Sequence, residues 1–84
     1  MIQWPEWWNW ELELSQHLFK RMLDRQFNEV DLREMLEQAT VFRPNHEQGR
    51  WAIETRHRGN DWVVIVEPLH DETVLLAVTA YPVG

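Results

Sequence analysis

The spacing of the apolar residues changes after Ala39, and this change restricts the chain to few architectures. Up to that point, Leu32, Met35, Leu36 and Ala39 follow the i, i+3, i+4, i+7 pattern of an amphipathic helix. Beyond it, short runs rich in β-branched residues have the composition of strands. Helices followed by a run of strands predict an α+β fold, with the helices packed on one face of an antiparallel sheet.

Two capped segments make up the helical part. Ser15 is a favourable N-cap for a helix that runs to about Arg25, and Asn28 is a favourable N-cap for a second helix. Asp31 lies in the first turn of the second helix, where the helix dipole stabilises an anion. The connection between the two segments is short, which predicts a helical hairpin or corner.

The first helix has two chemically distinct sides. The side expected to face the core consists of Leu18, Phe19, Met22 and Leu23. The other side carries the residues that recur at i, i+4 and i+8, namely His17, Arg21 and Arg25. From the spacing alone, this polar side is typical of a solvated helix surface.

Turn residues separate the strand-like segments, which are 40–43, 51–57, 62–66 and 73–81. Gly59 belongs to a strong turn signal after the second of these segments, and Pro68 begins the turn after the third. We therefore predict an antiparallel sheet of three to four strands built from consecutive hairpins.

Residues 1–14 form a tryptophan-rich arm, so we divide the chain into this arm and a single α+β domain over residues 15–84. Within the arm, residues 10–14 alternate between apolar and acidic side chains, as a short half-buried strand does. The arm is expected to pack on the sheet of its own chain or on a second copy, and packing on its own core is the commoner outcome. If the arm packs on a second copy instead, the chain forms a homodimer through Trp4, Trp7, Trp8 and Trp10.

Length and composition limit how the domain is stabilised and where it works. A chain of 84 residues forms one domain and buries only about 60–65% of its unfolded surface. It has no cysteine, so large side chains, oligomerisation or a partner must supply further stability. No run approaches the ~18 apolar residues of a membrane span, and the N-terminus lacks the features of a secretory signal. We expect a cytoplasmic protein that does not enter membranes.

The distribution of charge is more informative than the net charge of −6, which by itself argues against a nucleic-acid surface. All eight basic residues lie within residues 15–58, together with seven acidic ones, whereas the flanking segments carry acids alone. Seven of the eight are arginine, which binds phosphate or carboxylate through paired hydrogen bonds. The simplest interpretation is that most of them pair with neighbouring Glu and Asp on solvated helices.

Several kinds of site lack their signature in the sequence. The four histidines are scattered and cysteine is missing, so the ligand spacing of a zinc site is not present. The glycines stand alone and form no phosphate-binding loop. Ser15, the only serine, is already assigned as a helix cap, and nothing selects a pair of catalytic carboxylates. We therefore predict neither a metal nor a cofactor.

The residue types that remain suit metal-free RNA cleavage. That reaction needs a general base for the 2′-hydroxyl, cations for the crowded phosphorane and an acid for the leaving oxygen. The candidates are His17, Arg21 and Arg25 on the helix, Arg56 on a strand, and Thr79 and Tyr81 on one side of the last strand. On spacing alone, a charged helix surface and a buried tyrosine explain the same residues.

The segment from His17 to Leu32 resembles the opening motif of a family of small uncharacterised bacterial proteins. In that motif a His is followed four residues later by Arg-Met, then by another Arg and the start of a second helix. The later half is similar too, through Gly49-Arg50-Trp51, a Val-rich strand and the ending Val78-Thr79-Ala80-Tyr81. The resemblance covers residues 14–83. The family is similar in layout to the RelE and BrnT toxins of the barnase-like and colicin-like ribonuclease superfamily.

The resemblance implies a fold, an activity and a set of site residues. In the related toxins, a domain of two helices and a sheet cleaves RNA without metal, and antitoxin proteins neutralise many of them. It therefore implies a toxin-like endoribonuclease with an RNA substrate and an antitoxin partner. The implied site is an acid or base, His17, with phosphate-binding Arg21, Arg25 and Arg56 and a supporting hydroxyl from Thr79 or Tyr81.

The acidic composition departs from the basic toxins of this type, because RNA affinity depends largely on the neutralisation of phosphates. A second copy, a basic partner or a local group of arginines would have to compensate. The alternative function is a non-catalytic interaction module of the same fold, which dimerises or binds a partner through its tryptophan-rich arm.

Overall fold

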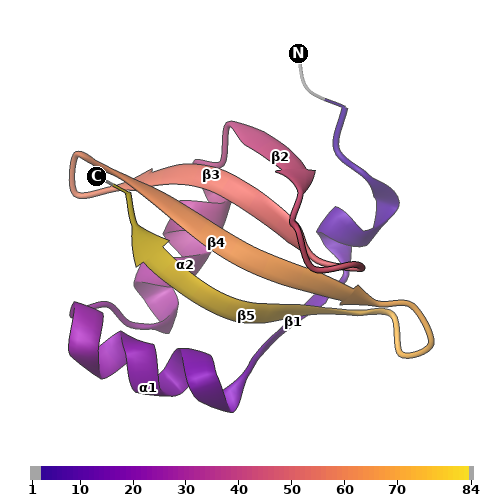
Figure 1. Cartoon of the computed structure of the whole chain (residues 1–84), viewed down its shortest axis with the longest axis horizontal. Coiled ribbons are helices and arrows are strands. Elements are labelled where there is room, and N and C mark those ends of the chain that lie inside the picture. Colours follow the sequence, from indigo (N-terminus) through magenta and orange to yellow (C-terminus); the bar gives the residue numbers. More distant parts are fainter. Residues whose placement is uncertain (1–2, 84) are drawn as a thin grey trace.

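The structure is a computed structural model that describes residues 3–83. In it, two α-helices pack on a five-stranded mixed sheet (Figure 1). The helices are the short 3-10 helix η1 (Glu6–Asn9), α1 (Gln16–Arg25) and α2 (Glu29–Glu37). The strands are β1 (Glu11–Leu14), β2 (Val41–Pro44), β3 (Trp51–His57), β4 (Asn60–Leu69) and β5 (Val74–Pro82). The predicted α+β class is confirmed.

The sheet has the strand order β1-β5-β4-β3-β2, and its first strand distinguishes it from the predicted sheet. The pairs β2–β3, β3–β4 and β4–β5 are antiparallel, but β1 runs parallel to β5, with Glu11 opposite Val74 and Leu14 opposite Ala77. The prediction of a purely antiparallel sheet of three to four strands is therefore wrong. Both helices and three strands lie between β1 and β5 in the chain, and a connection of this length allows neighbouring strands to be parallel.

Both α-helices begin where their caps predict. The Ser15 hydroxyl accepts a hydrogen bond from the Leu18 amide at 3.0 Å. Asn28 and Asp31 form a capping box, in which each side chain accepts from the other residue's amide, at 2.9 and 3.0 Å. Gln26 adopts the left-handed conformation (φ 56°) and ends α1. None of the described helices is long and apolar enough to cross a membrane.

The rotation of α1 about its axis differs from the prediction. Leu18 is fully buried and Met22 is half-buried, as expected. Phe19, however, is 53% exposed and Leu23 is 85% exposed. The prediction that Phe19 and Leu23 face the core is therefore wrong.

Two polar contacts with β5 set this rotation. The Ser15 hydroxyl donates to the Val78 carbonyl at 2.7 Å, and Nη1 of Arg25 donates to the Ala80 carbonyl at 2.7 Å. These contacts hold both ends of α1 against β5. Arg21 and Arg25 are half-buried, whereas His17 on the same side of the helix remains exposed.

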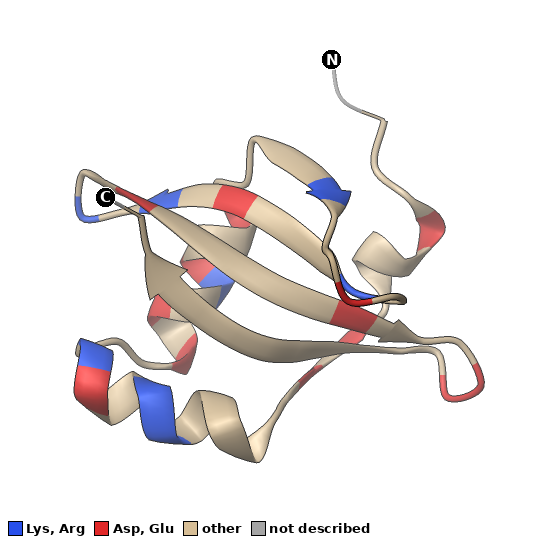
Figure 2. Ribbon diagram, viewed as in Figure 1, with Lys and Arg blue, Asp and Glu red and all other residues tan. Residues whose placement is uncertain are grey.

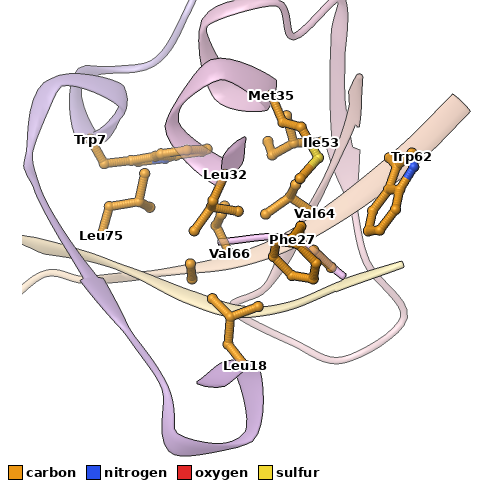
Figure 3. Close-up of a cluster of buried hydrophobic side chains, with 12 residues drawn as sticks. Trp7, Leu18, Phe27, Leu32, Met35, Ile53, Trp62, Val64, Val66 and Leu75 are labelled. Atoms are coloured by element: carbon orange, nitrogen blue, oxygen red, sulfur yellow. The ribbon is translucent and has the colours of Figure 1, made fainter. Parts of the chain in front are cut away.

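The main hydrophobic core lies between the helices and one face of the sheet (Figure 3). Its largest fully buried side chains are Leu18, Leu32, Met35, Ile53, Val64 and Val66. Trp7 of η1 also belongs to this core and is only 7% exposed, so the arm is anchored on its own chain. The buried Thr55 hydroxyl donates to the Met35 carbonyl, which fastens α2 to β3.

Within residues 3–83, no helix covers the opposite face of the sheet (Figure 1). Ala52, Val63 and Ile65 form a second, small apolar cluster on it, together with Val78. Polar side chains on the same face therefore remain accessible to a ligand. We refer to this side as the uncovered face.

Candidate functional site

The C-terminal half of β5 is the place where predicted site residues from different elements approach one another. A register shift between β4 and β5 pairs Thr79 with Ile65 and Tyr81 with Val63. Val63 and Ile65 belong to the uncovered face, so Thr79 and Tyr81 face that side with them. The two hydroxyl groups therefore lie along one strand, on the accessible side of the sheet.

α1 closes the free edge of this part of β5. The β1–β5 ladder ends at Ala77, and beyond it the edge carbonyls of Val78 and Ala80 accept hydrogen bonds from Ser15 and Arg25. Arg25 is thus fixed beside the segment that carries both hydroxyl groups. Its guanidinium has five N–H donors, and the bond to Ala80 uses one of them.

His17 and Arg21 lie nearer the N-terminus of α1. Arg21 donates from Nη1 to Asp24 at 2.8 Å. Its Nε is buried and has no hydrogen-bond acceptor within residues 3–83. An unsatisfied buried donor of this kind costs about 1–3 kcal/mol unless a water, an ion or a ligand accepts from it. His17 is exposed in the first turn of the helix.

A groove of about 560 Å³ lies beside Tyr81 on the uncovered face. Its volume is in the range of small-ligand sites. Among its lining residues are Arg43, Glu54, Arg56, Asp61, Val63 and Tyr81. Two of the six predicted site residues, Arg56 and Tyr81, therefore line one groove. His17, Arg21, Arg25 and Thr79 do not line it.

The charged side chains of this groove are paired with one another. Arg43 donates from Nε to Glu54 at 2.8 Å, and Nε of Arg56 lies 3.9 Å from a carboxylate oxygen of Asp61. Arg56 also donates to the Gly59 carbonyl at 2.7 Å. The four side chains of the ion pairs are at least 45% exposed, and exposed pairs contribute only about 0–1 kcal/mol each. An incoming phosphate can therefore displace the carboxylates at small cost.

Sequence reasoning did not select Arg43 and Glu54, which the structure adds to the site. Glu54 and Arg56 are two residues apart on β3, so strand alternation alone places them on the same face. Arg43 joins them because β2 pairs with β3, opposite Ala52. The first relation was visible in the sequence, whereas the second depends on the register of β2.

The chemistry available around β5 is that of acid, base and cation. The groove offers a phenol, two carboxylates and two guanidinium groups, and α1 adds two further arginines and an imidazole. Among residues 3–83, no group of three or more His, Cys, Asp or Glu side chains is arranged to hold a metal ion. Comparisons with protein-family models, with curated proteins and with solved structures give no match to this chain. The functional interpretation therefore depends on this geometry and on the sequence motif.

Proposed function

We propose that this chain is a metal-independent endoribonuclease of toxin type, in which RNA binds along the C-terminal half of β5. One observation carries the proposal: cations approach this segment from both sides. Arg25 reaches its edge from α1, and Arg56 and Tyr81 share the groove on the uncovered face. An RNA strand that crosses β5 would therefore meet Arg25 at the edge of the sheet and Arg56 with the Tyr81 phenol in the groove.

The proposed reaction is an internal transesterification. The 2′-oxygen of the substrate attacks the neighbouring phosphorus while the bond from phosphorus to the 5′-oxygen breaks, which leaves a 2′,3′-cyclic phosphate and a 5′-hydroxyl. A base accepts the proton of the 2′-hydroxyl, and an acid returns a proton to the leaving 5′-oxygen. Guanidinium groups stabilise the negative charge of the pentacoordinate phosphorus.

The residues divide between these tasks according to where they lie. Arg56 binds the phosphate in the groove, Arg25 binds a neighbouring phosphate at the edge of β5, and the Nε of Arg21 is available for a further contact on the helix side. Tyr81 is the proton donor inside the groove. His17 takes the acid or base role that the sequence motif implies, and Glu54 is a second candidate base because it lines the same groove as Tyr81.

The layout of the molecule supports the finer assignment to a RelE-like or barnase-like fold as part of the same proposal. Both helices cover one face of the sheet, and the other face holds the candidate groove. A protein of toxin type also implies a protein partner that neutralises it.

Expression in a bacterial host tests the proposal in cells. We compare the wild type with the variants His17→Ala, Arg56→Gln and Tyr81→Phe. Each protein is expressed alone and together with the product of the reading frame next to its gene, the candidate neutralising partner, and growth and total RNA integrity are recorded. We expect the wild type alone to slow growth and degrade RNA. Removal of a general acid or base typically lowers the rate by about 10²–10⁴-fold, so Tyr81→Phe should restore growth.

The matched control is Arg33→Gln, which removes an exposed arginine of α2 that pairs with Glu29 and does not line the groove of Arg56 and Tyr81. This control should remain toxic. A wild type that leaves growth and RNA unchanged would contradict the ribonuclease function. If Arg56→Gln and Tyr81→Phe remain toxic and His17→Ala does not, the catalytic site lies on α1 and not in the groove.

A further inference from the structure

The outer edge of β1 is open for strand pairing. β1 is the first strand in the sheet order, and within residues 3–83 it pairs only with β5 (Figure 1). The other exposed edges are protected: α1 closes the end of β5, and β2 ends in Pro44, which has no backbone donor. An edge strand presents N–H and C=O groups to which another extended chain can add.

A preformed groove runs beside this edge, on the helix side of the sheet. It has a volume of about 420 Å³, and its lining includes Trp8, Trp10, Leu12, Arg33, Leu36 and Glu37. Two aromatic contacts fix its tryptophan wall: Trp8 stacks on Trp4 at 4.2 Å, and Trp10 meets the ring of His70 edge-on at 5.3 Å. The groove is therefore suited to apolar side chains from an added strand.

The opposite side of the same edge is acidic. Leu12 and Leu14 pack against the core, so strand alternation directs the exposed Glu11 and Glu13 toward the uncovered face, and Glu11 also borders the groove. In the described part of the chain, Glu11, Glu13 and Glu37 have no ion-pair partner. Arg33, the one cation that lines the groove, is bonded to Glu29 through Nε and Nη2. This edge consequently carries uncompensated negative charge.

We propose that β1 is the docking edge for an extended basic segment of a partner protein, which adds to the sheet as a further strand. Its backbone pairs with the outer edge of β1. Alternate side chains of the segment are Lys or Arg, which face Glu11 and Glu13, and apolar residues, which enter the groove of Trp8, Trp10 and Leu36. The proposal is independent of the ribonuclease function.

Charge selects this partner over a second copy of the chain. Pairing of two β1 strands would bring Glu11 and Glu13 of one copy close to the same residues of the other, and like charges on neighbouring strands are destabilising. The segments around this edge are acidic as well: the arm, which includes β1, and the β4–β5 turn carry acidic and no basic residues (Figure 2). A basic segment is the complement of this surface.

A short synthetic peptide of alternating Lys and Leu is the probe. Binding to the full chain is measured by titration calorimetry at low salt, and the amides that shift on binding are mapped by NMR. We expect shifts centred on β1 and on the indole groups of Trp8 and Trp10. Replacement of both acids, Glu11→Gln with Glu13→Gln, should weaken binding roughly three- to thirtyfold, as expected for the loss of two exposed charge pairs.

The controls separate strand addition from general charge attraction. Asp24→Asn with Asp61→Asn makes the same change in net charge away from β1 and should leave the affinity unchanged. Two versions of the same peptide, one N-methylated at its leucines and one at its lysines, remove the two alternate sets of backbone donors in turn. The version that removes the donors facing β1 should bind at least about tenfold more weakly than the unmethylated peptide. Equal effects of the two double variants, no effect of methylation, or no binding of the peptide would overturn the proposal. Concentration-dependent dimerisation of the free protein through β1 would assign the edge to a second copy and would overturn it too.

Discussion

Arg25 joins α1 to β5 through one part-buried hydrogen bond to the Ala80 carbonyl. Bonds from charged donors contribute about 1.5–3 kcal/mol, so Arg25→Met should lower the free energy of unfolding by roughly that amount. Lys20→Met on the exposed side of the same helix is the control and should change it by less than about 0.5 kcal/mol. Urea unfolding of both variants measures the difference, and equal values would mean that Arg25 does not hold the helix in place.

Single residues also show where sequence reasoning succeeds. Ser15 and Asn28 were recognised as caps because a cap acts on backbone groups three residues away, and both are caps in the structure. The half-buried position of Arg21 and Arg25 was not predicted. For Arg25 it depends on the Ala80 carbonyl of β5, 55 residues away in the chain, and no local pattern indicates such a partner.

At the scale of the element, α1 separates buried from exposed leucines. Leu18 is fully buried in the core, so Leu18→Ala should cost about 2–5 kcal/mol of unfolding free energy. Leu23 is 85% exposed, and Leu23→Ala should change stability by no more than about 0.5 kcal/mol. Thermal and urea denaturation of the two variants provide the comparison. A large loss of stability in Leu23→Ala would restore the apolar face that the sequence predicts.

The same helix shows why the spacing of apolar residues predicts the helix but not which of them face the core. Leu18, Phe19, Met22 and Leu23 satisfy helical spacing as a group, but their stripe is wide enough to allow more than one rotation about the axis. Polar contacts at the ends of the helix select one rotation. Likewise, residues 10–14 were recognised as strand-like, whereas their parallel pairing with β5 depends on a partner 63 residues further along the chain.

At the scale of the whole molecule, charge separates the two proposed surfaces. Basic residues lie on α1, α2, β2, β3 and their turns, and acids alone occupy the arm and the β4–β5 turn (Figure 2). The net charge of −6 is therefore a poor guide to the field that RNA would meet at the C-terminal half of β5. Asp24 and Asp61 pair with Arg21 and Arg56 and therefore compete with RNA phosphates for these two arginines.

Removal of these competitors should strengthen RNA binding. Asp24→Asn with Asp61→Asn is expected to tighten binding to a single-stranded RNA by about two- to tenfold at low salt, because two arginines become free to contact phosphate. Fluorescence anisotropy of a labelled RNA measures this change. Glu11→Gln with Glu13→Gln makes the same change in net charge at β1. If it tightened binding equally, the effect would be one of net charge and not of the site.

The central claim is that side chains around the C-terminal half of β5 cleave RNA without a metal ion. The most direct measurement is the digestion of a labelled RNA by the purified wild type and by Tyr81→Phe in the presence of a metal chelator, with analysis of the product ends. We predict cleavage by the wild type that leaves 2′,3′-cyclic phosphate ends, fails when the 2′-hydroxyl at the cleaved position is removed, and falls by about 10²–10⁴-fold in Tyr81→Phe. Intact RNA after incubation with the wild type, or equal cleavage by the two proteins, would contradict the claim.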